Sequence, residues 1–432
     1  MALLEARWHR AAADRRLPAF PYPRHQLRFP MLDTISTTGG IDLPDPERVI
    51  ATVSAMCERS SVSGTEGALA EWVEAELSRM GLATRRQEVL PARSNIIATL
   101  ETGRPGPTLL FNGHLDTLPV PAGYSHDPFR SFVRDGRIYG AEINNMKGAV
   151  AAMIGAMGAL SSAKEQLCGR IILSAVMGEC DSLGLGTVAL VEDGLSADFC
   201  INGEPTDLQV MTCHVGVTQL RVRARGSYVH VSRRHDDRNA IAELLPALAS
   251  IGEGCLTFRP HPDFPGLPTI NIGKVTGGSM ASMLAAEAEA LIDVRTVPGM
   301  TPESVLADIE RAIAGTRTPA GTIPDVEISL IERPVFCQQH PYLVDRDHTV
   351  VGAVAHAHQR LTGTRPYVGP LYPQVFFGTD ASHLNRAGIA TVIYGPGKCE
   401  EINVVDESMR VDDLIHAANV YTLAGALLCA QQ

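Results

Sequence analysis

Short apolar runs that alternate with helical patterns constrain the fold of this chain more than any other feature of its sequence. Three such runs are typical of buried strands, at residues 108–117, 170–177 and 197–203. Residues 65–81 carry apolar side chains at helical spacing, and residues 147–160 are apolar on nearly every side, as in a buried helix. Buried strands that alternate with helices indicate a mostly parallel sheet covered on both faces. We therefore expect an α/β fold.

The pattern changes after about residue 216, where half-exposed strands and two helices follow. These elements are expected at residues 218–232, 239–254, 289–299, 301–315 and 325–332. Such a mixture predicts a small α+β unit of ordinary domain size inserted into the larger fold. We divide the chain into an N-terminal extension (1–45), an α/β domain (46–216 and 333–432) and an inserted domain (217–332).

The composition excludes two classes of partner. Of 432 residues, 45% are hydrophobic and 20% are charged, and the formal net charge is −11. Nucleic-acid binding requires a basic face, so we expect no nucleic-acid partner. No run reaches the ~18 apolar residues of a membrane span, and the arginine-rich N-terminus lacks the apolar core of a signal peptide. The nine cysteines form no CxxC pair, so we expect a reduced, cytoplasmic protein without a membrane partner.

Polar residues capable of chemistry follow four of the expected strands and loops. They are His114 and Asp116, Asn144 and Asn145, Glu179 with Cys180 and Asp181, and Glu204. Ligands in such sheets bind at the carboxyl ends of the strands, so we expect these side chains to converge on one cleft. In an extended segment, residues two apart share a face. Asp116 is then placed to orient the His114 imidazole, and Glu179 and Asp181 would point together as two acids for proton transfer.

A series of short motifs resembles one enzyme superfamily. In chain order they are NGHLDTLP, HDPF, DGRIYG, MKGAVAAM, GLGT, GEPT, the pair Gly226 and His230, NAI, GKVTGG, DVR, GTDAS and YGPG. Their order and spacing are similar to those of the dinuclear-zinc aminoacylases, glutamate carboxypeptidases, acetylornithine deacetylases and succinyl-diaminopimelate desuccinylases. The resemblance implies a zinc-peptidase-like α/β domain with an inserted α+β, ferredoxin-like lid that commonly mediates dimerisation. We therefore expect a homodimer formed through the lid.

The resemblance also implies a metal site, and this chain departs from it. Members hold two metals with a bridging aspartate, one histidine and one carboxylate on each side, and a separate glutamate as general base. His114 matches the first histidine and Glu204 its carboxylate partner. Elsewhere Asn145 stands at the bridging aspartate, Cys180 at the base, Asp181 at a metal carboxylate and Asn403 at the second histidine. Zinc prefers carboxylates and imidazoles to neutral amides.

We therefore expect no cofactor or a single divalent metal, zinc, cobalt or manganese, and not dinuclear zinc. The candidate ligands are His114, Glu204, Asp181, Asn145 and Asn403. Alternative ligands close in sequence are Cys399, Glu400, Glu401 and His383.

The substrate-binding motifs are better retained. His230 resembles the lid histidine that reaches into the partner subunit's site and stabilises an oxyanion. Arg295 resembles the arginine that grips a substrate carboxylate, a task suited to a bidentate guanidinium. Ser282 stands where members usually have a substrate-binding asparagine, whereas Gly378 and Thr379 keep the GTD motif. The pattern indicates a pocket that still binds a small carboxylate-bearing acyl amino acid or peptide-like molecule.

Cys180 has two interpretations. A thiolate between a strand end and a helix can act as a nucleophile, but Glu179 and Asp181 beside it would raise its pKa. The alternative is a small buried thiol that fills the space of a lost glutamate. We predict an enzyme of this superfamily that performs acyl transfer, cyclisation, isomerisation or metal-poor hydrolysis, with Glu179, Cys180, His230 and Asp116 as its polar machinery. The alternatives are a non-catalytic relative that binds a small acid or a partner, and a conventional zinc-dependent deacylase with replaced ligands.

Overall fold

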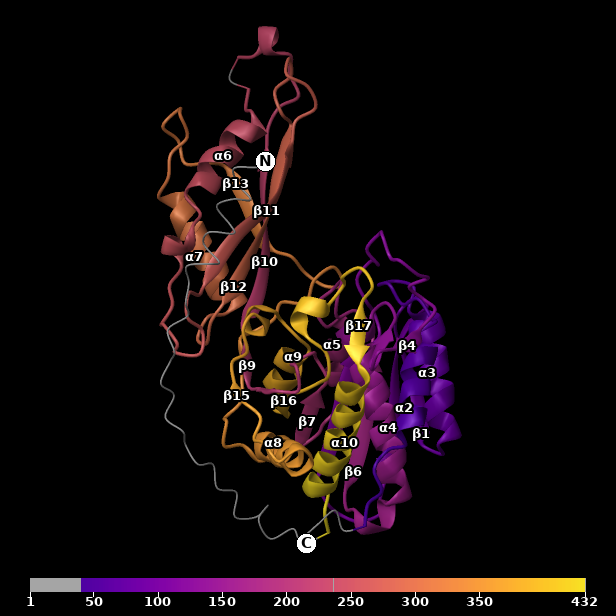
Figure 1. Cartoon of the computed structure of the whole chain (residues 1–432). Helices are drawn as coiled ribbons and strands as arrows, with labels where there is room; N and C mark the ends of the chain where they lie inside the picture. Colours follow the sequence, from indigo (N-terminus) through magenta and orange to yellow (C-terminus); the bar gives the residue numbers. More distant parts are fainter. Residues whose placement is uncertain (1–39, 236, 432) are drawn as a thin grey trace.

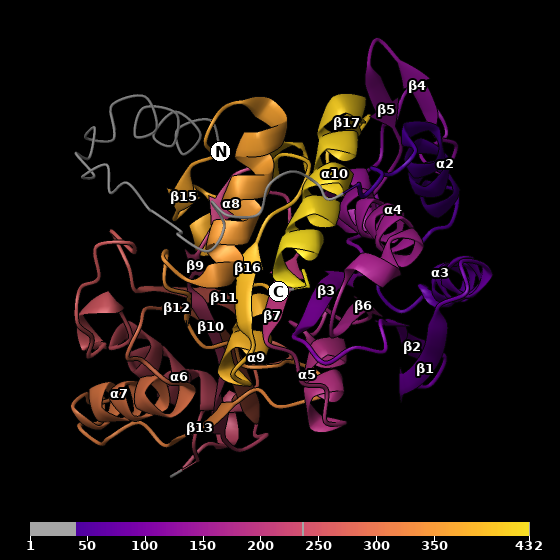
Figure 2. The same ribbon diagram turned by 90° about the horizontal axis from the view of Figure 1, so that it is seen from below.

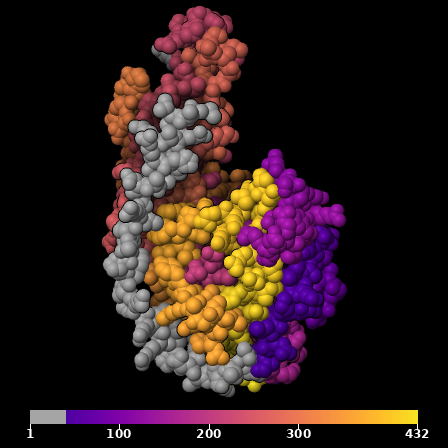
Figure 3. Space-filling model, viewed as in Figure 1, coloured from indigo at the N-terminus to yellow at the C-terminus, as the bar shows by residue number. Residues whose placement is uncertain are grey.

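The computed structural model describes residues 40–235 and 237–431. Most of the predicted N-terminal extension, residues 1–39, lies outside the described residues. The described chain forms a large α/β unit and a smaller four-stranded unit that rises from it as a separate lobe (Figures 1 and 3). Within the described ranges, no helix has the length and apolar character needed to cross a bilayer.

An eight-stranded mixed sheet forms the centre of the large unit. In spatial order its strands are β1 (Ala83–Leu90), β2 (Arg93–Glu101), β6 (Arg170–Val176), β3 (Thr108–His114), β7 (Phe199–Asn202), β16 (Ala390–Ile393), β8 (Val210–Met211) and β15 (Val368–Gly369). The middle strands β6, β3, β7 and β16 run parallel, while β1 and β2 pair antiparallel at one edge. The α/β prediction is confirmed, and the antiparallel pairs make the sheet mixed.

Helices cover both faces of this sheet (Figure 2). One face packs against α2 (Pro46–Cys57), α3 (Gly67–Arg79), α4 (Gly148–Ser162), α8 (Thr349–Thr362) and α10 (Val411–Leu428), and the other against α5 (Leu185–Glu192) and α9 (Ala381–Arg386). In β3, Leu109 and Phe111 join the first core, whereas Leu110 joins the second. Burial on both sides explains why β3 and β6 are continuously apolar rather than alternating.

The smaller unit is a β-α-β-β-α-β arrangement of the ferredoxin-like type. Its elements are β10 (Gly216–Arg225), α6 (Ala240–Ala249), β11 (Thr269–Gly277), β12 (Glu287–Thr296), α7 (Pro302–Ala314) and β13 (Val326–Leu330). The strands pair antiparallel in the order β11-β12-β10-β13. Its own core joins Leu220 and Val222 of β10 to Leu244 of α6 and Ile309 of α7. The unit therefore has a core separate from those of the large sheet.

Two details of this unit differ from the predicted elements. The strand predicted over residues 218–232 ends at Arg225, and a short 3-10 helix covers Val231–Arg233 instead. Strand β11 has no counterpart among the predicted strands. Most of its side chains are exposed in this chain, so they give little of the apolar alternation by which a strand is recognised.

Two small sheets complete the described structure near the site. Strands β4 (Phe132–Arg134), β5 (Arg137–Tyr139) and β17 (Ser408–Arg410) form one, and β9 (Cys213–His214) with β14 (Tyr342–Leu343) forms the other. The second sheet leads directly into β10, which continues into the four-stranded unit.

Candidate active site

A pocket of about 640 Å³ opens where the central strands β3, β6 and β7 end. Among its lining residues are eight of the sequence-predicted candidates: Asn145, Glu179, Cys180, Glu204, Arg295, Gly378, Thr379 and Asn403. The parallel middle of the sheet brings these segments together, because the carboxyl ends of parallel strands meet at one edge. Apolar side chains, including those of Leu118, Met211 and Phe377, complete the wall.

His114, the last residue of β3, lies buried beneath this pocket. Its Nδ1 lies 2.7 Å from the backbone oxygen of Asp116. A carbonyl oxygen only accepts, so Nδ1 carries the hydrogen and Nε2 points to the other side. Nε2 lies 3.2 Å from Asn145 Oδ1, 3.7 Å from Glu204 Oε1 and 3.9 Å from Glu179 Oε2. One amide oxygen and two carboxylate oxygens thus face one ring nitrogen. A positive charge at this point, from a protonated imidazole or a cation, would balance the two acids.

The electrostatic environment of His114 also favours a positive charge on the imidazole. Burial opposes a charge on His114, but the carboxylates of Glu204, Glu179 and Asp116 outweigh it and raise the pKa of the imidazole to about 9. Burial also raises the pKa of Glu179 and of Glu204, against the opposing effect of His114. Within the described part of the chain, Glu204 Oε1 is buried and has no hydrogen-bond partner. A proton or a metal ion would satisfy this atom.

The Asp116 carboxylate serves a different purpose from the one expected. It is fully buried and accepts hydrogen bonds from the backbone N–H of Glu179 (3.0 Å) and Cys180 (2.9 Å) and from the Ser63 hydroxyl (3.0 Å). Its Oδ1 lies 3.9 Å from His114 Nδ1, so the Asp116 backbone carbonyl, rather than its side chain, orients the imidazole. Strand β3 ends at His114, so the strand alternation assumed from the sequence does not extend to Asp116.

The segment from Glu179 to Leu183 is a turn and not the extended strand assumed from its sequence, since β6 ends at Val176. Glu179 and Asp181 therefore point apart. Glu179 faces His114, while Asp181 forms an ion pair with Arg93 of β2 at 2.8 Å. The structure does not bring Asp181 together with His114, because Arg93 holds it on the other side of the turn.

Cys180 lines the pocket with its thiol protonated. Burial raises the pKa of Cys180 well above its usual range, and the negative charges of Asp116 and Glu179 act in the same direction. Its Sγ lies 3.4 Å from the Asp116 backbone oxygen, to which the thiol donates. This environment disfavours the thiolate that a nucleophile requires.

Arg295, near the end of β12, brings a cation from the four-stranded unit to the pocket. Its Nε donates to Asp293 Oδ1 (2.7 Å) and its Nη1 to the Phe376 carbonyl (3.2 Å), so the guanidinium is held in place. The Thr379 hydroxyl, also at the pocket, lies 3.0 Å from Nε2 of the buried His214. Burial lowers the pKa of His214 to about 4, and the imidazole is therefore a neutral acceptor for Thr379.

The other two substrate-binding candidates lie away from the pocket within one chain. His230 and Ser282 are neighbours in the four-stranded unit, where the backbone N–H of Val231 donates to the Ser282 carbonyl (2.9 Å). The His230 ring nitrogen Nδ1 lies 2.7 Å from the Ser232 hydroxyl. Neither residue is among those that line the pocket.

Comparison with known proteins identifies the chain at family level. The sequence model of Peptidase family M20/M25/M40 matches residues 110–425. The chain belongs to this family. The resemblance that the motifs indicated is thereby confirmed.

Curated relatives of this family cover most of the chain. It is 27% identical over 393 residues to an N-formyl-4-amino-5-aminomethyl-2-methylpyrimidine deformylase of Bacillus subtilis, which spans 82% of this chain and 88% of that protein. It is also 27% identical over 369 residues to an acetylornithine deacetylase of Vibrio campbellii, with 84% and 90% covered.

Solved structures of the family share the fold. The aminopeptidase PepT of Bacillus cereus matches with a TM-score of 0.70 at 19% identity, over 90% of this chain and 100% of that chain. A dinuclear metal binding peptidase of the M20 family from Bacillus subtilis matches with a TM-score of 0.65 at 18% identity, over 89% and 98%. The expected zinc-peptidase-like fold with its inserted unit is confirmed.

The described residues of this M20 chain include side chains that could hold a metal ion. In the described residues, two groups of three possible ligands occur: His114 with Glu179 and Glu204, and His114 with Asp116 and Cys180. In the second group the Asp116 oxygens already accept three hydrogen bonds. The first group has the unpartnered Oε1 of Glu204 and suits a divalent cation.

The positions that would serve a second ion carry Asn145, Asp181 and Asn403. Two of these are neutral amides, and the Asp181 carboxylate pairs with Arg93 at 2.8 Å. Of the alternative ligands, Cys399 lines the pocket, but Glu401 pairs with Arg137 at 2.6 Å and His383 Nε2 donates to the Leu183 carbonyl at 2.7 Å. These two side chains are therefore engaged elsewhere.

Asp380 is an acid that the sequence analysis did not single out. It is fully buried at the start of α9, and burial raises its pKa to about 7 against the opposing charge of His114. Both carboxylate oxygens are buried, and the Thr187 side chain opposes the effect of burial on the pKa. Its position next to Thr379 in the GTD motif was the available signal.

Proposed function

We propose that this M20 family member is an amide hydrolase for a small carboxylate-bearing acyl amino acid or peptide-like substrate, and that it uses a single divalent metal ion. The observation that supports this most directly is the buried group formed by His114 Nε2, Glu204 Oε1 and Asn145 Oδ1, with Glu179 beside it. The remaining positions of a two-metal site carry side chains that are poor ligands for hard cations.

In this proposal His114, Glu204 and Asn145 hold the ion. When bound, a divalent ion supplies Lewis-acid polarisation of the substrate carbonyl and activation of water. The Asp116 backbone carbonyl fixes the His114 ring so that Nε2 faces the pocket, as partners of metal-binding histidines generally do. Glu179, also at the pocket wall, is the proton acceptor and donor of the reaction.

Substrate orientation follows from the two ends of the pocket. Arg295 offers a guanidinium that Asp293 and the Phe376 carbonyl hold in place at the four-stranded unit. Each of its two Nη atoms keeps one N–H beyond these contacts, and this pair suits a substrate carboxylate. The buried acids and His114 lie at the other end, where the scissile amide would sit. Two of the curated relatives are named as a deformylase and a deacetylase, and removal of a small acyl group from nitrogen is consistent with this layout.

Metal analysis tests this function. Metal-free protein titrated with Co²⁺ or Zn²⁺ should bind one equivalent per chain at the pocket, and Glu204→Gln should abolish that binding. Glu310→Gln removes an exposed carboxylate of α7 and should leave the stoichiometry at one. The rate at which N-formyl and N-acetyl amino acids are hydrolysed should rise with the fraction of chains that hold the metal ion. Two tightly bound equivalents in the unaltered chain, or turnover that persists after complete metal removal, would overturn the proposal.

We also propose that the chain forms a homodimer through the four-stranded unit. Strand β11 is an edge strand, and its surface exposes Ile272 and Val275 to solvent. Ile241 and Leu245 of α6 are exposed as well, and Ile241 borders β11 at Gly277. An exposed edge strand with apolar neighbours is a surface that proteins normally pair or cover. In such a dimer His230 would be available to the partner subunit's pocket, as the family resemblance implies.

A further inference from the structure

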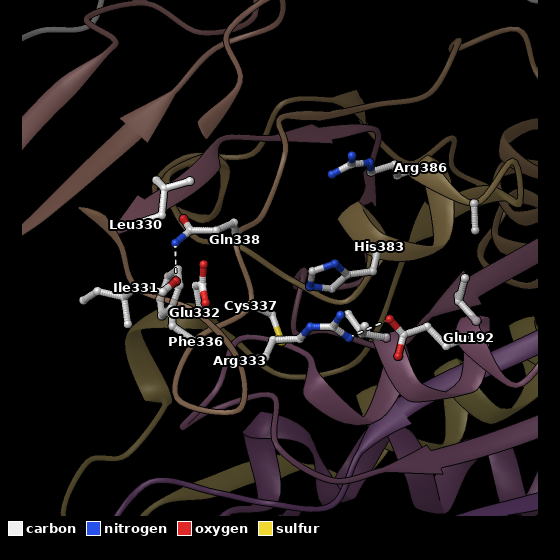
Figure 4. A pocket seen from close by; sticks show the side chains of 13 residues that line it. Glu192, Leu330, Ile331, Glu332, Arg333, Phe336, Cys337, Gln338, His383 and Arg386 are labelled. Carbon is white, nitrogen blue, oxygen red and sulfur yellow. Dashed lines mark hydrogen bonds and ion pairs between the residues drawn. The ribbon is translucent and has the colours of Figure 1, made fainter. Parts of the chain in front are cut away.

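A second cavity, of about 780 Å³, lies where the four-stranded unit joins the large unit (Figure 4). Its walls come from α5 and α9 of the large unit and from residues 330–338, which run on from the end of β13. The hydrolase function proposed above does not use it. We call it the junction pocket.

The junction pocket combines an apolar wall with one available cation. Val188, Val191, Ile331 and Phe336 form the apolar part. Of its two arginines, Arg333 already pairs with Glu192 at 2.7 Å. Arg386 forms no ion pair within the described chain and contacts His340 instead. Burial lowers the pKa of His340, and so does the charge of Arg386, so the imidazole does not balance the arginine charge. The charge of Arg386 also helps to lower the pKa of Glu303, but in the described residues the two side chains form no ion pair.

The charges are arranged to orient a ligand. Figure 4 shows the Arg386 guanidinium and Glu332 on different sides of the cavity, with Glu192 next to Arg333. A carboxylate is therefore favoured beside Arg386 and disfavoured beside Glu332, whereas the charge of Glu192 is balanced by Arg333. A guanidinium without a carboxylate partner is the group best suited to bind one. Such a lining is suited to an apolar molecule with a single carboxylate.

The junction pocket also contacts the turn that carries Glu179 and Cys180. His383, which points into the cavity in Figure 4, donates from Nε2 to the Leu183 carbonyl (2.7 Å). The backbone N–H of Cys337 donates to the Ser182 carbonyl (2.8 Å). Leu183 itself lines the candidate active site. One wall is therefore shared by both pockets.

We propose that the junction pocket is a second ligand site for a small aliphatic monocarboxylate, and that its occupancy changes the turn from Glu179 to Leu183. The ligand's carboxylate binds Arg386 and its chain packs on Val191 and Phe336. Because the walls belong to both units and bond directly to this turn, the bound ligand acts on the candidate active site without entering it.

Hexanoate, with hexanol and adipate as matched probes, tests the site by calorimetry. The Arg295→Gln variant is the starting protein, because it removes the carboxylate-binding arginine of the first pocket. It should bind one hexanoate per chain, and hexanol and adipate more weakly. Adding Arg386→Gln should raise the hexanoate Kd about tenfold or more, whereas adding Arg360→Gln, at an exposed arginine of α8, should leave it unchanged. Equal binding of hexanol, or equal effects of the two added substitutions, would overturn the site.

Alkylation of Cys180 tests the effect on the turn and needs no enzymatic activity. In the Arg295→Gln protein, saturating hexanoate should change the rate of N-ethylmaleimide labelling of Cys180, followed by peptide mass spectrometry, by about fivefold or more. With Arg386→Gln added, the same hexanoate concentration should have little effect. An unchanged rate at full occupancy would show that the two pockets are not coupled.

Discussion

Replacing Asp116 with asparagine should destabilise the protein by about 2 kcal/mol, although the two side chains have nearly the same shape. The Asp116 carboxylate is fully buried and accepts three hydrogen bonds. Its Oδ1 accepts from the Glu179 backbone N–H, and its Oδ2 accepts from Cys180 N–H and the Ser63 hydroxyl. An asparagine has one acceptor oxygen, so one backbone N–H must face an NH₂ group.

The magnitude follows from that lost contact. A hydrogen bond to a charged group contributes about 1.5–3 kcal/mol, and a buried donor left without a partner costs about 1–3 kcal/mol. The Ser63 hydroxyl can reverse and accept from the new amide, so its contact is retained. Loss of a negative charge near Glu179 and Glu204 relieves some repulsion, which places the net change near the lower part of these ranges.

Urea denaturation at pH 7 measures the change. Asp127→Asn is a matched control, because Asp127 also accepts from a backbone N–H, that of Phe129 at 3.0 Å, but is exposed. Asparagine makes the same kind of turn contact there, so the control should differ from the wild type by less than about 0.5 kcal/mol. If Asp116→Asn were as stable as this control, Asp116 would not hold the turn as inferred.

Three further predictions concern other parts of the molecule. Burial lowers the pKa of His214 to about 4 from the ordinary 6.5, so the unfolded chain takes up a proton that the folded chain refuses. Stability should therefore fall as the pH drops from about 6.5 towards 4, and His214→Gln should make Tm less dependent on pH across that window; an unchanged dependence would contradict this. Val275→Lys should convert the proposed dimer to a monomer in light scattering, whereas Val133→Lys, at an equally exposed valine of β4, should not. The double variant Asn145→Asp with Asn403→His should bind a second equivalent of Co²⁺, and binding of one equivalent would refute our account of why the second ion is disfavoured.

Much of the fold could be predicted because elements that are buried on several sides have recognisably apolar sequences. Strands β3 and β6 are apolar throughout since both of their faces are covered, and α4 is apolar on nearly all sides for the same reason. Strand β11 shows the limit of this signal. It lies at a sheet edge with most side chains in solvent, so it is fixed by its pairing with β12 rather than by its own pattern.

The candidate site was harder to predict where contacts between residues distant in sequence decide which way a side chain points. His114 and Glu204 lie at or just after the ends of β3 and β7, Asn145 lies shortly before α4, and the structure brings the three together. Glu179 and Asp181 are only two residues apart, yet they point to different partners. The difference is set by Arg93, which lies far away in sequence and pairs with Asp181. No local pattern reports such a contact.

Charge balance supports the proposal of a single ion in this pocket. Around His114 Nε2 stand two carboxylates, those of Glu179 and Glu204, and one amide, that of Asn145. One divalent ion would neutralise the two acids. A second ion would meet Asn403 and a protonated Cys180, which offer dipoles but no negative charge, and desolvating it there would be unfavourable. The substitutions therefore act together: Asn145 and Cys180 stand where the family resemblance implies carboxylates, and Asn403 stands where it implies an imidazole, so the side facing a second cation lacks both negative charge and a strong neutral ligand.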